Sequence, residues 1–449
     1  MIYQDSTKNV FKMSIPIFIE LMLQLLVGNV DQIMISRYSQ GSVAAIGNGN
    51  QIMSIVIIFL NVMSVSTTIL ISRYLGAQDK QKINEVCNVS LLMLGIVALL
   101  ATAIIFIGHN SIFVWMKVPA DILGEASQYL TVVAICILAQ GFYMVLASIL
   151  RSFGLMKEVM YVAAIMNIIN IIGNTLLING LFGFPQLGIL GAAISTNISK
   201  CIGLILIFAL FRKNIAVELS FKYLRPFPKE TLKNLLKIGL PSGGEELSYN
   251  LSQVYIFKFI NLFGTAIIAT KVYCSLLANV SYVYSIALAN ATQIMVSYLM
   301  GAMDLEKVRK RVWTTTGISM IIALSITGII YINSDWIFRI FTSDPAIIAL
   351  GKKIILIEFF LEIGRTVNIV MTKCLVAVGD VMFPVITGII FMWFVAVLFS
   401  YIVGVRMGYG LIGIWIVMTI DESLRGIIFI LRFRSKKWQK KLAPSPQPN

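Results

Sequence analysis

The sequence predicts an all-α integral membrane protein with about twelve transmembrane helices in two six-helix lobes, which are related by a parallel internal repeat. Three features lead to this prediction: an apolar composition, a series of long apolar segments, and matching motifs in the two halves. Of the 449 residues, 58% are hydrophobic and 13% are charged, and the mean hydropathy is +0.86. Soluble domains carry about 25% charged residues, so lipid must cover much of this surface.

The apolar segments have the length of membrane-spanning helices. A helix needs about 20 mostly apolar residues to cross a bilayer, whereas barrel strands alternate polar and apolar residues over about 10 positions. These segments are longer than such strands and apolar on most faces, so we expect helices. The predicted spans lie near residues 14–36, 45–72, 86–108, 129–150, 159–181, 188–211, 238–262, 272–297, 312–333, 354–376, 383–404 and 410–431.

The basic residues orient the chain. The net charge is +15, from 36 Lys and Arg against 21 Asp and Glu. Of these 36, 24 lie in the loops and ends on one side of the predicted spans, and seven lie in loops on the other side. Cytoplasmic loops are enriched in Lys and Arg. We therefore predict a multi-pass protein of the cell's inner (plasma) membrane with both termini in the cytoplasm, and no nucleic acid as a partner.

The start of the chain, the histidine and the cysteines indicate no further chemistry. The segment MIYQDSTKNVFK lacks the basic region and cleavage site of a signal peptide, so the first span is expected to stay in the protein. The single His109 is expected to be a solvated loop residue rather than a general base. Because no two cysteines form a CxxC pair, we predict no disulfide framework, no metal site and no resident cofactor. The cysteines are Cys87, Cys136, Cys201, Cys274 and Cys374.

The two halves of the chain share motifs at one constant offset in the sequence. KNVFKMSIPIFIE (8–20) matches KNLLKIGLPSGGE (233–245), and SRYLGAQDKQK (72–82) matches SYLMGAMDLEK (297–307). The identities fall on Lys, Pro, Glu, Gly and Asp as well as on apolar residues, so they indicate two homologous lobes. The predicted parts are an N-terminal lobe at 1–211, a cytoplasmic loop at 212–237, a C-terminal lobe at 238–435 and a disordered cytoplasmic tail at 436–449.

A parallel repeat of this kind is typical of transporters. Six spans per lobe is an even number, so both lobes enter the membrane from the same side. In such proteins the substrate path lies between the lobes, and access alternates as the lobes rock. The alternative is a duplication that was kept for packing alone.

The first lobe carries polar side chains within its predicted spans. A charged side chain at a helix centre costs about 2.5–3.5 kcal/mol on insertion scales. Asp31, with no basic residue within a turn, therefore predicts a bound cation, a proton or a partner across helices, and Glu20 lies on nearly the same helix face. Asn170 and Asn174 share one face of the fifth span, and Thr196 adds a hydroxyl in the next. Amide and hydroxyl oxygens around one carboxylate suit Na⁺.

The second lobe carries charged side chains that are candidates for an additional polar or substrate path. Glu358, Glu362 and Arg365 follow one another at helical spacing and form one stripe. The alternative is that opposite charges one turn apart, as also at Asp421 and Arg425, are buried ion pairs that only hold helices together. The path candidates of both lobes are Glu20, Glu245, Glu246, Glu358, Glu362 and Arg365.

Several segments resemble the multidrug and toxic compound extrusion (MATE) family of the multidrug/oligosaccharidyl-lipid/polysaccharide exporter superfamily. They are VDQIMISRYSQGSVAAIGNGNQI, the LGAQD loop, PQLGILGAAIST and GLIGIWIVMTIDESLRG. The similarity runs from about residue 8 to 435. It implies a V-shaped pair of six-helix lobes that exports organic cations in exchange for Na⁺ or H⁺.

The resemblance also implies a coupling site in the N-terminal lobe. Asp31 stands where many bacterial members have the first-helix aspartate that helps to bind the coupling ion, and its family companions fall on Asn170, Asn174 and Thr196. Some branches have aspartate where this chain has Asn174. One sodium-coupled branch has aspartate where this chain has Arg365, so we place the predicted site in the first lobe.

The predicted function is secondary active multidrug efflux by a monomer, which exports small organic cations in exchange for Na⁺ or H⁺. The alternative is a flippase for a lipid-linked or polysaccharide precursor. Lys200, Arg365 and Arg425 favour it, whereas Asp31, Glu20 and Glu245 argue against it. An enzyme is not expected, because HExxH, GxSxG and DxD-like patterns are missing. The missing P-loop leaves an ion gradient or a partner as the energy source, and the two-lobed repeat favours rocking over a fixed channel.

Overall fold

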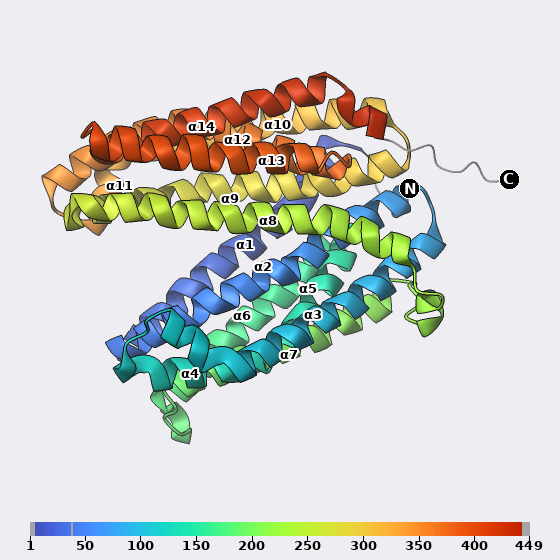
Figure 1. The fold of residues 1–449 in the computed structure, drawn as a ribbon, viewed down its shortest axis with the longest axis horizontal. Helices are drawn as coiled ribbons and strands as arrows, with labels where there is room; N and C mark the ends of the chain where they lie inside the picture. The colour runs from blue at the N-terminus through green and yellow to red at the C-terminus, as the bar shows by residue number, and fades with distance from the viewer. Residues whose placement is uncertain (1–4, 37–38, 442–449) are drawn as a thin grey trace. The chain divides into compact units, whose positions relative to one another are not determined.

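The computed structural model describes residues 5–36 and 39–441, which are mostly helical and contain no strand (Figure 1). This confirms the predicted all-α fold. The first half contains α1 (Thr7–Ser36), α2 (Gln40–Gly76), α3 (Lys80–Trp115), α4 (Ala120–Ala134), α5 (Ile137–Ser152), α6 (Met156–Asn179) and α7 (Ile189–Asn214). The second half contains α8 (Lys229–Ile260), α9 (Thr265–Gly301), α10 (Leu305–Ile332), α11 (Ser334–Phe341), α12 (Pro345–Ala377), α13 (Met382–Phe391), which continues as π-helix at Met392–Val397 and Ser400–Arg406, and α14 (Gly410–Arg434).

These helices account for about twelve spans, as predicted. Among the described residues, eight helices are long and apolar enough to cross a membrane, and the bent pair α4 and α5 makes a ninth. Helices α8, α12 and α14 have 32, 33 and 25 residues. They are long enough to span, although each carries several charged side chains.

The chain divides into two compact units. One comprises residues 19–239, and the other comprises the described residues before 19 and from 240 onward. In the first unit α2 packs against α3, α4 and α5, and α6 packs against α7. In the second unit α12 contacts α9, α10 and α14. Both α1 and α8 pass from one unit into the other close to an internal proline, Pro16 or Pro241.

The repeat is visible in the backbone as well as in the sequence. Asp79 caps α3 by accepting a hydrogen bond from the Lys82 N–H at 2.9 Å. The carboxylate of Asp304, its counterpart in the second half, caps α10 in the same way, with the Lys307 N–H at 3.1 Å. Positive φ angles recur at equivalent positions, at Gln78 and Met303 (59° and 57°) and at Gly154 and Gly379 (86° and 93°).

The two lobes differ at their fourth span. In the second half this span is the continuous helix α12. Its counterpart in the first half is broken into α4 and α5, which bend by 47°. The predicted span at 129–150 therefore consists of two helices.

Side chains from neighbouring helices stabilise this break. The backbone N–H groups at residues 135 and 136 donate to carbonyls three residues back rather than four. The Asn197 amide of α7 donates to the Val132 carbonyl at 2.5 Å, and the Thr102 hydroxyl of α3 donates to the Ala134 carbonyl at 3.3 Å. Insertion of polar side chains into the helical ladder is a known cause of kinks.

Candidate functional site

A cluster of uncharged polar side chains lies between α6 and α7. Asn170 and Asn174 are one turn apart on α6, and 5% and 1% of their surfaces are exposed. The Asn170 Nδ2 donates to the Thr196 Oγ1 at 3.3 Å, and the Asn174 Nδ2 donates to the Asn170 Oδ1 at 3.5 Å. The structure thus brings together three of the four residues predicted for cation coupling.

Two glycines allow α6 and α7 to approach closely at this cluster. A Cβ atom at Gly173 would overlap the Ser195 side chain, and one at Gly191 would lie 2.5 Å from the Leu177 carbonyl oxygen. Small residues permit such close packing of membrane helices. The short separation places the Thr196 hydroxyl within reach of α6.

The two carboxylates of α1 differ in what the structure shows. Asp31 lies within α1, but its side chain is outside the described residues, so its role as the coupling carboxylate stays a prediction. Glu20 is 4% exposed and forms an ion pair with Arg151 of α5, with 2.5 Å between Oε1 and Nη2. The sequence did not predict this pair. The negative charge of Glu20 is therefore balanced by the guanidinium group of Arg151.

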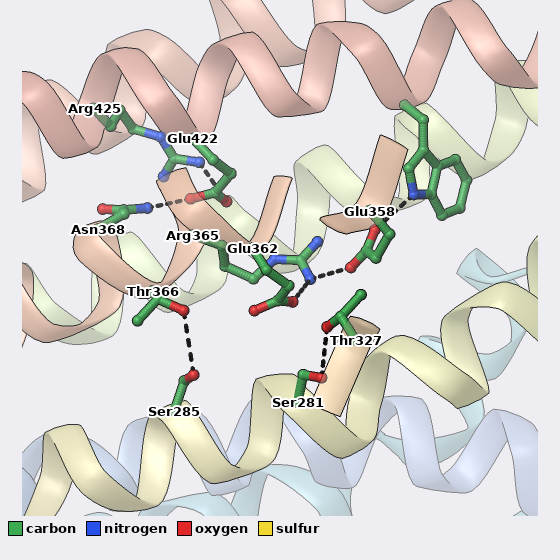
Figure 2. A network of polar contacts seen from close by, with 11 residues as sticks. Ser281, Ser285, Thr327, Glu358, Glu362, Arg365, Thr366, Asn368, Glu422 and Arg425 are labelled. Carbon is green, nitrogen blue, oxygen red and sulfur yellow. Dashed lines mark hydrogen bonds and ion pairs between the residues drawn. The ribbon is translucent and has the colours of Figure 1, made fainter. Parts of the chain in front are cut away.

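In the second unit the predicted stripe of charges on α12 forms one cluster (Figure 2). The Arg365 Nη1 donates to the Glu358 Oε1 at 2.5 Å and to the Glu362 Oε1 at 2.6 Å. These glutamates are 1% and 0% exposed. The indole of Trp415, on α14, donates to the second oxygen of Glu358 at 2.7 Å.

A second arginine continues the network on α14. Arg425 binds Asp421, and its Nη2 donates to the Glu422 Oε1 at 2.9 Å. The Asn368 amide of α12 donates to the other Glu422 oxygen at 2.5 Å (Figure 2). Asn368, Glu422 and Trp415 were not among the predicted site residues. The sequence did contain a signal for two of them, because Asn368 follows Arg365 by one helical turn and Glu422 is next to Asp421 in the sequence.

The network contains more carboxylates than cations. Four carboxylates, at positions 358, 362, 421 and 422, share two guanidinium groups. Among the described residues, the Glu362 Oε2 and the Asp421 Oδ1 are buried without a hydrogen-bond partner. An unpaired buried carboxylate is costly, so this arrangement favours additional positive charge, either as protons or as a bound cation.

The remaining predicted path residues of the second unit, Glu245 and Glu246, lie on α8, and Glu245 interacts electrostatically with Arg425 and Glu422 of the network. Glu245 of α8 faces α13, since a Cβ atom at Gly388 would lie 3.1 Å from the Glu245 Oε1. The neighbouring Glu246 is exposed on the unit's surface. Within residues 5–36 and 39–441, no three His, Cys, Asp or Glu side chains are grouped as ligands of a metal ion.

About twelve spans in two repeated halves, each with polar side chains buried among the described helices, define a membrane transporter built from a parallel repeat. The comparison with family models identifies the transporter family. The MatE model matches residues 16–176 and again residues 241–402, so the chain belongs to the MatE family. The two matches begin at equivalent positions of the internal repeat, Pro16 and Pro241.

Similar proteins cover the whole chain. It is 36% identical to "Uncharacterized transporter YisQ" of Bacillus subtilis, over 97% of this chain and 96% of that protein. It is 26% identical to "Probable multidrug resistance protein NorM" of Thermotoga maritima, over 97% and 93%. Crystal structures of MATE in the bent and the straight conformation each match with a TM-score of 0.88 at 23% identity, and cover 97% and 98% of both chains. The protein is thus a multi-pass membrane transporter.

Proposed function

We propose that the protein is a monomeric secondary transporter that exports small organic cations in exchange for Na⁺ or H⁺ by alternating access. The observation that carries this proposal is the excess of buried carboxylates over guanidinium groups in the second unit. Such an excess attracts cations and disfavours anions. The family membership and the name of the Thermotoga maritima relative, a probable multidrug resistance protein, support export of drugs.

In this proposal the cluster between α6 and α7 supplies ligands for a metal cation, if the coupling ion is one. The side-chain oxygens of Asn170, Asn174 and Thr196 are hard ligands of the kind that hard cations prefer. In this proposal Asp31 supplies the negative charge. If the coupling ion is H⁺, Asp31 carries the proton and the cluster binds the carboxyl group.

A flippase for a phosphate-bearing precursor is the second candidate. It needs free cationic side chains to hold the phosphates. Arg365 and Arg425, which favour this function in the sequence, each bind two carboxylates, so they offer no free charge. The geometry of the second unit supports cation export over the flippase, whereas Lys200 of the first unit, which has no carboxylate partner among the described residues, still favours the flippase.

The test is ethidium efflux from proteoliposomes under an imposed Na⁺ gradient or pH gradient. We expect one gradient to drive efflux by the wild type and Asp31→Asn to abolish it. Asp121→Asn, which changes an exposed carboxylate at the start of α4, is the matched control and should export normally. Full efflux by Asp31→Asn would exclude the first-lobe coupling site. No ethidium movement under either gradient would favour the flippase, to be tested with a fluorescent lipid-linked substrate.

A further inference from the structure

Two of the five cysteines lie next to each other in the first unit, although 65 residues separate them in the sequence. The Sγ atoms of Cys136 and Cys201 are 3.6 Å apart. Cys136 lies in the break between α4 and α5 and is 8% exposed. Cys201 lies near the middle of α7 and is exposed on the unit's surface. Both positions are central in spans, so lipid-soluble compounds can reach the pair.

The break between α4 and α5 brings the two thiols together. Asn197 donates to the Val132 carbonyl in the turn before the break, and Cys201 follows Asn197 by one turn on the same face of α7. The amide therefore holds α7 against the break and directs Cys201 toward Cys136. The second lobe has neither the break nor the cysteine pair. Its fourth span, α12, is continuous, and the residues equivalent to Cys136 and Cys201 are Leu361 and Gly426.

The residue next to Cys201 is a lysine, Lys200, that lies close enough to both thiols to interact with them electrostatically. Lys200 is the first-lobe counterpart of Arg425, but the two carboxylates that bind Arg425 correspond to the neutral Thr196 and Asn197. Within the part of the chain that the structure describes, Lys200 forms no ion pair with a carboxylate. An ionised sulfur at either cysteine would attract the ammonium group of Lys200. In the first lobe, therefore, two thiols lie near the lysine, whereas the second lobe has acidic partners for its arginine.

We propose that Cys136 and Cys201, with Lys200 beside them, form a redox-active dithiol site for lipid-soluble two-electron oxidants of the quinone class. A thiolate is the nucleophilic form of cysteine; the neighbouring lysine favours it, whereas the burial of Cys136 opposes it. Both S–H bonds break and one S–S bond forms, and the quinone takes up the two electrons and two protons to become a quinol. The sulfur atoms need only approach from 3.6 Å to about 2.0 Å.

The same geometry suits bridging by a trivalent arsenical. Phenylarsine oxide would form two As–S bonds, one to each sulfur, and release its oxygen with the two thiol protons as water. This compound therefore probes the dithiol without any oxidant. Either product joins α7 covalently to the break in the fourth span.

The test uses the full-length protein in lipid vesicles. After treatment with duroquinone, which is fully substituted and cannot arylate thiols, the protein is unfolded and its free thiols are counted with N-ethylmaleimide. We expect the count to fall by two from the five cysteines, to recover with dithiothreitol, and to map to a Cys136–Cys201 peptide. Phenylarsine oxide should bind at one per chain. Cys136→Ser or Cys201→Ser should abolish both reactions, and the control Cys87→Ser should lose two thiols as the wild type does.

A further variant tests the part played by the lysine. Lys200→Met should reach the same end point about tenfold more slowly, because the cation that favours the thiolate is gone. Five free thiols after duroquinone in the wild type, a disulfide that maps to other cysteines, or loss of two thiols in Cys136→Ser would each overturn the proposal. These readouts do not depend on transport, so they stand or fall separately from the proposed export.

Discussion

Arg365 serves two carboxylates at once, because one of its guanidinium nitrogens donates to both Glu358 and Glu362. The two glutamates have almost no contact with solvent. Their charges depend on this single side chain, with a further contribution from the Trp415 indole. Removal of the arginine alone should therefore destabilise the protein strongly, whereas removal of the charges of Glu358, Glu362 and Arg365 together should destabilise it much less.

We expect Arg365→Met to lower the free energy of unfolding by about 3–5 kcal/mol, the usual cost of leaving a buried charge without its partner. The triple variant with Glu358→Gln and Glu362→Gln should recover most of the loss, because neutral amides need no counter-charge. Thermal unfolding of the purified protein in detergent measures both. Equal midpoints for the wild type and Arg365→Met would contradict the role assigned to this network.

Thr196 allows a test of the cluster between α6 and α7. Thr196→Val removes the oxygen that accepts from Asn170 and keeps the shape of the side chain. Loss of a buried hydrogen-bonding group costs about 1–3 kcal/mol, so the ion concentration for half-maximal export should rise by about 5- to 150-fold. Thr196→Ser, which keeps the hydroxyl, should export nearly normally. An unchanged ion dependence in Thr196→Val would remove this residue from the coupling site.

Local spacing predicted some of the polar contacts and missed others. Asn170 and Asn174 are one helical turn apart, so the sequence alone places them on one face. The partners that come from other helices carry no such signal. Arg151 reaches Glu20 across 131 residues and Trp415 reaches Glu358 across 57, and both contacts depend on how the helices pack.

At the level of single helices, hydropathy predicted where most spans lie, because the length of an apolar segment directly reflects the thickness of the bilayer. It did not predict the break between α4 and α5. The segment TVVAICI at 131–137 contains no proline or glycine to mark a kink. The break is stabilised by side chains of α3 and α7, which only the folded structure brings there.

Because α12 packs closely on α14 at Gly364, we expect a larger side chain at this position to destabilise the protein. A Cβ atom there would lie 2.5 Å from the Ser423 backbone nitrogen, so Gly364→Ala must push the helices apart. We expect a loss of about 1–3 kcal/mol, as for overpacking in other cores. Gly317→Ala is the control, because no atom lies within 4 Å of its Cβ position; better helix propensity should make it neutral or stabilising by up to about 1 kcal/mol. Unfolding in detergent compares the two variants, and equal effects would contradict the proposed close contact.

For the molecule as a whole, the internal repeat was the most informative part of the sequence. It predicted two equivalent halves, and the family model matches each half separately. The capping turns before α3 and α10 have the same geometry, whereas Thr196, Asn197 and Lys200 of the first lobe correspond to Asp421, Glu422 and Arg425 of the second. The repeat could therefore predict the scaffold of each lobe but not its chemistry.

The proposed orientation of the chain is testable by labelling. Lys310→Cys places a thiol in the basic segment proposed to be cytoplasmic, and Ser343→Cys places one between α11 and α12 on the opposite side; both positions are exposed. A membrane-impermeant maleimide should label Ser343→Cys on intact cells and Lys310→Cys only after permeabilisation. The wild type measures background labelling. The reverse pattern would invert the topology.

The passage of α1 and α8 between the units has a consequence for how the halves can be separated. A chain cut between α7 and α8 would yield two fragments, and each would contain the first turns of a helix that complete the other fragment's unit. Neither fragment would be whole when expressed alone, yet the pair should reassemble when co-expressed. In an ancestral single-lobe protein with the same arrangement, the first helix of each protomer would have begun in the partner, so the protein would have been an obligate dimer with exchanged N-terminal segments. Gene duplication would then have made that exchange intramolecular.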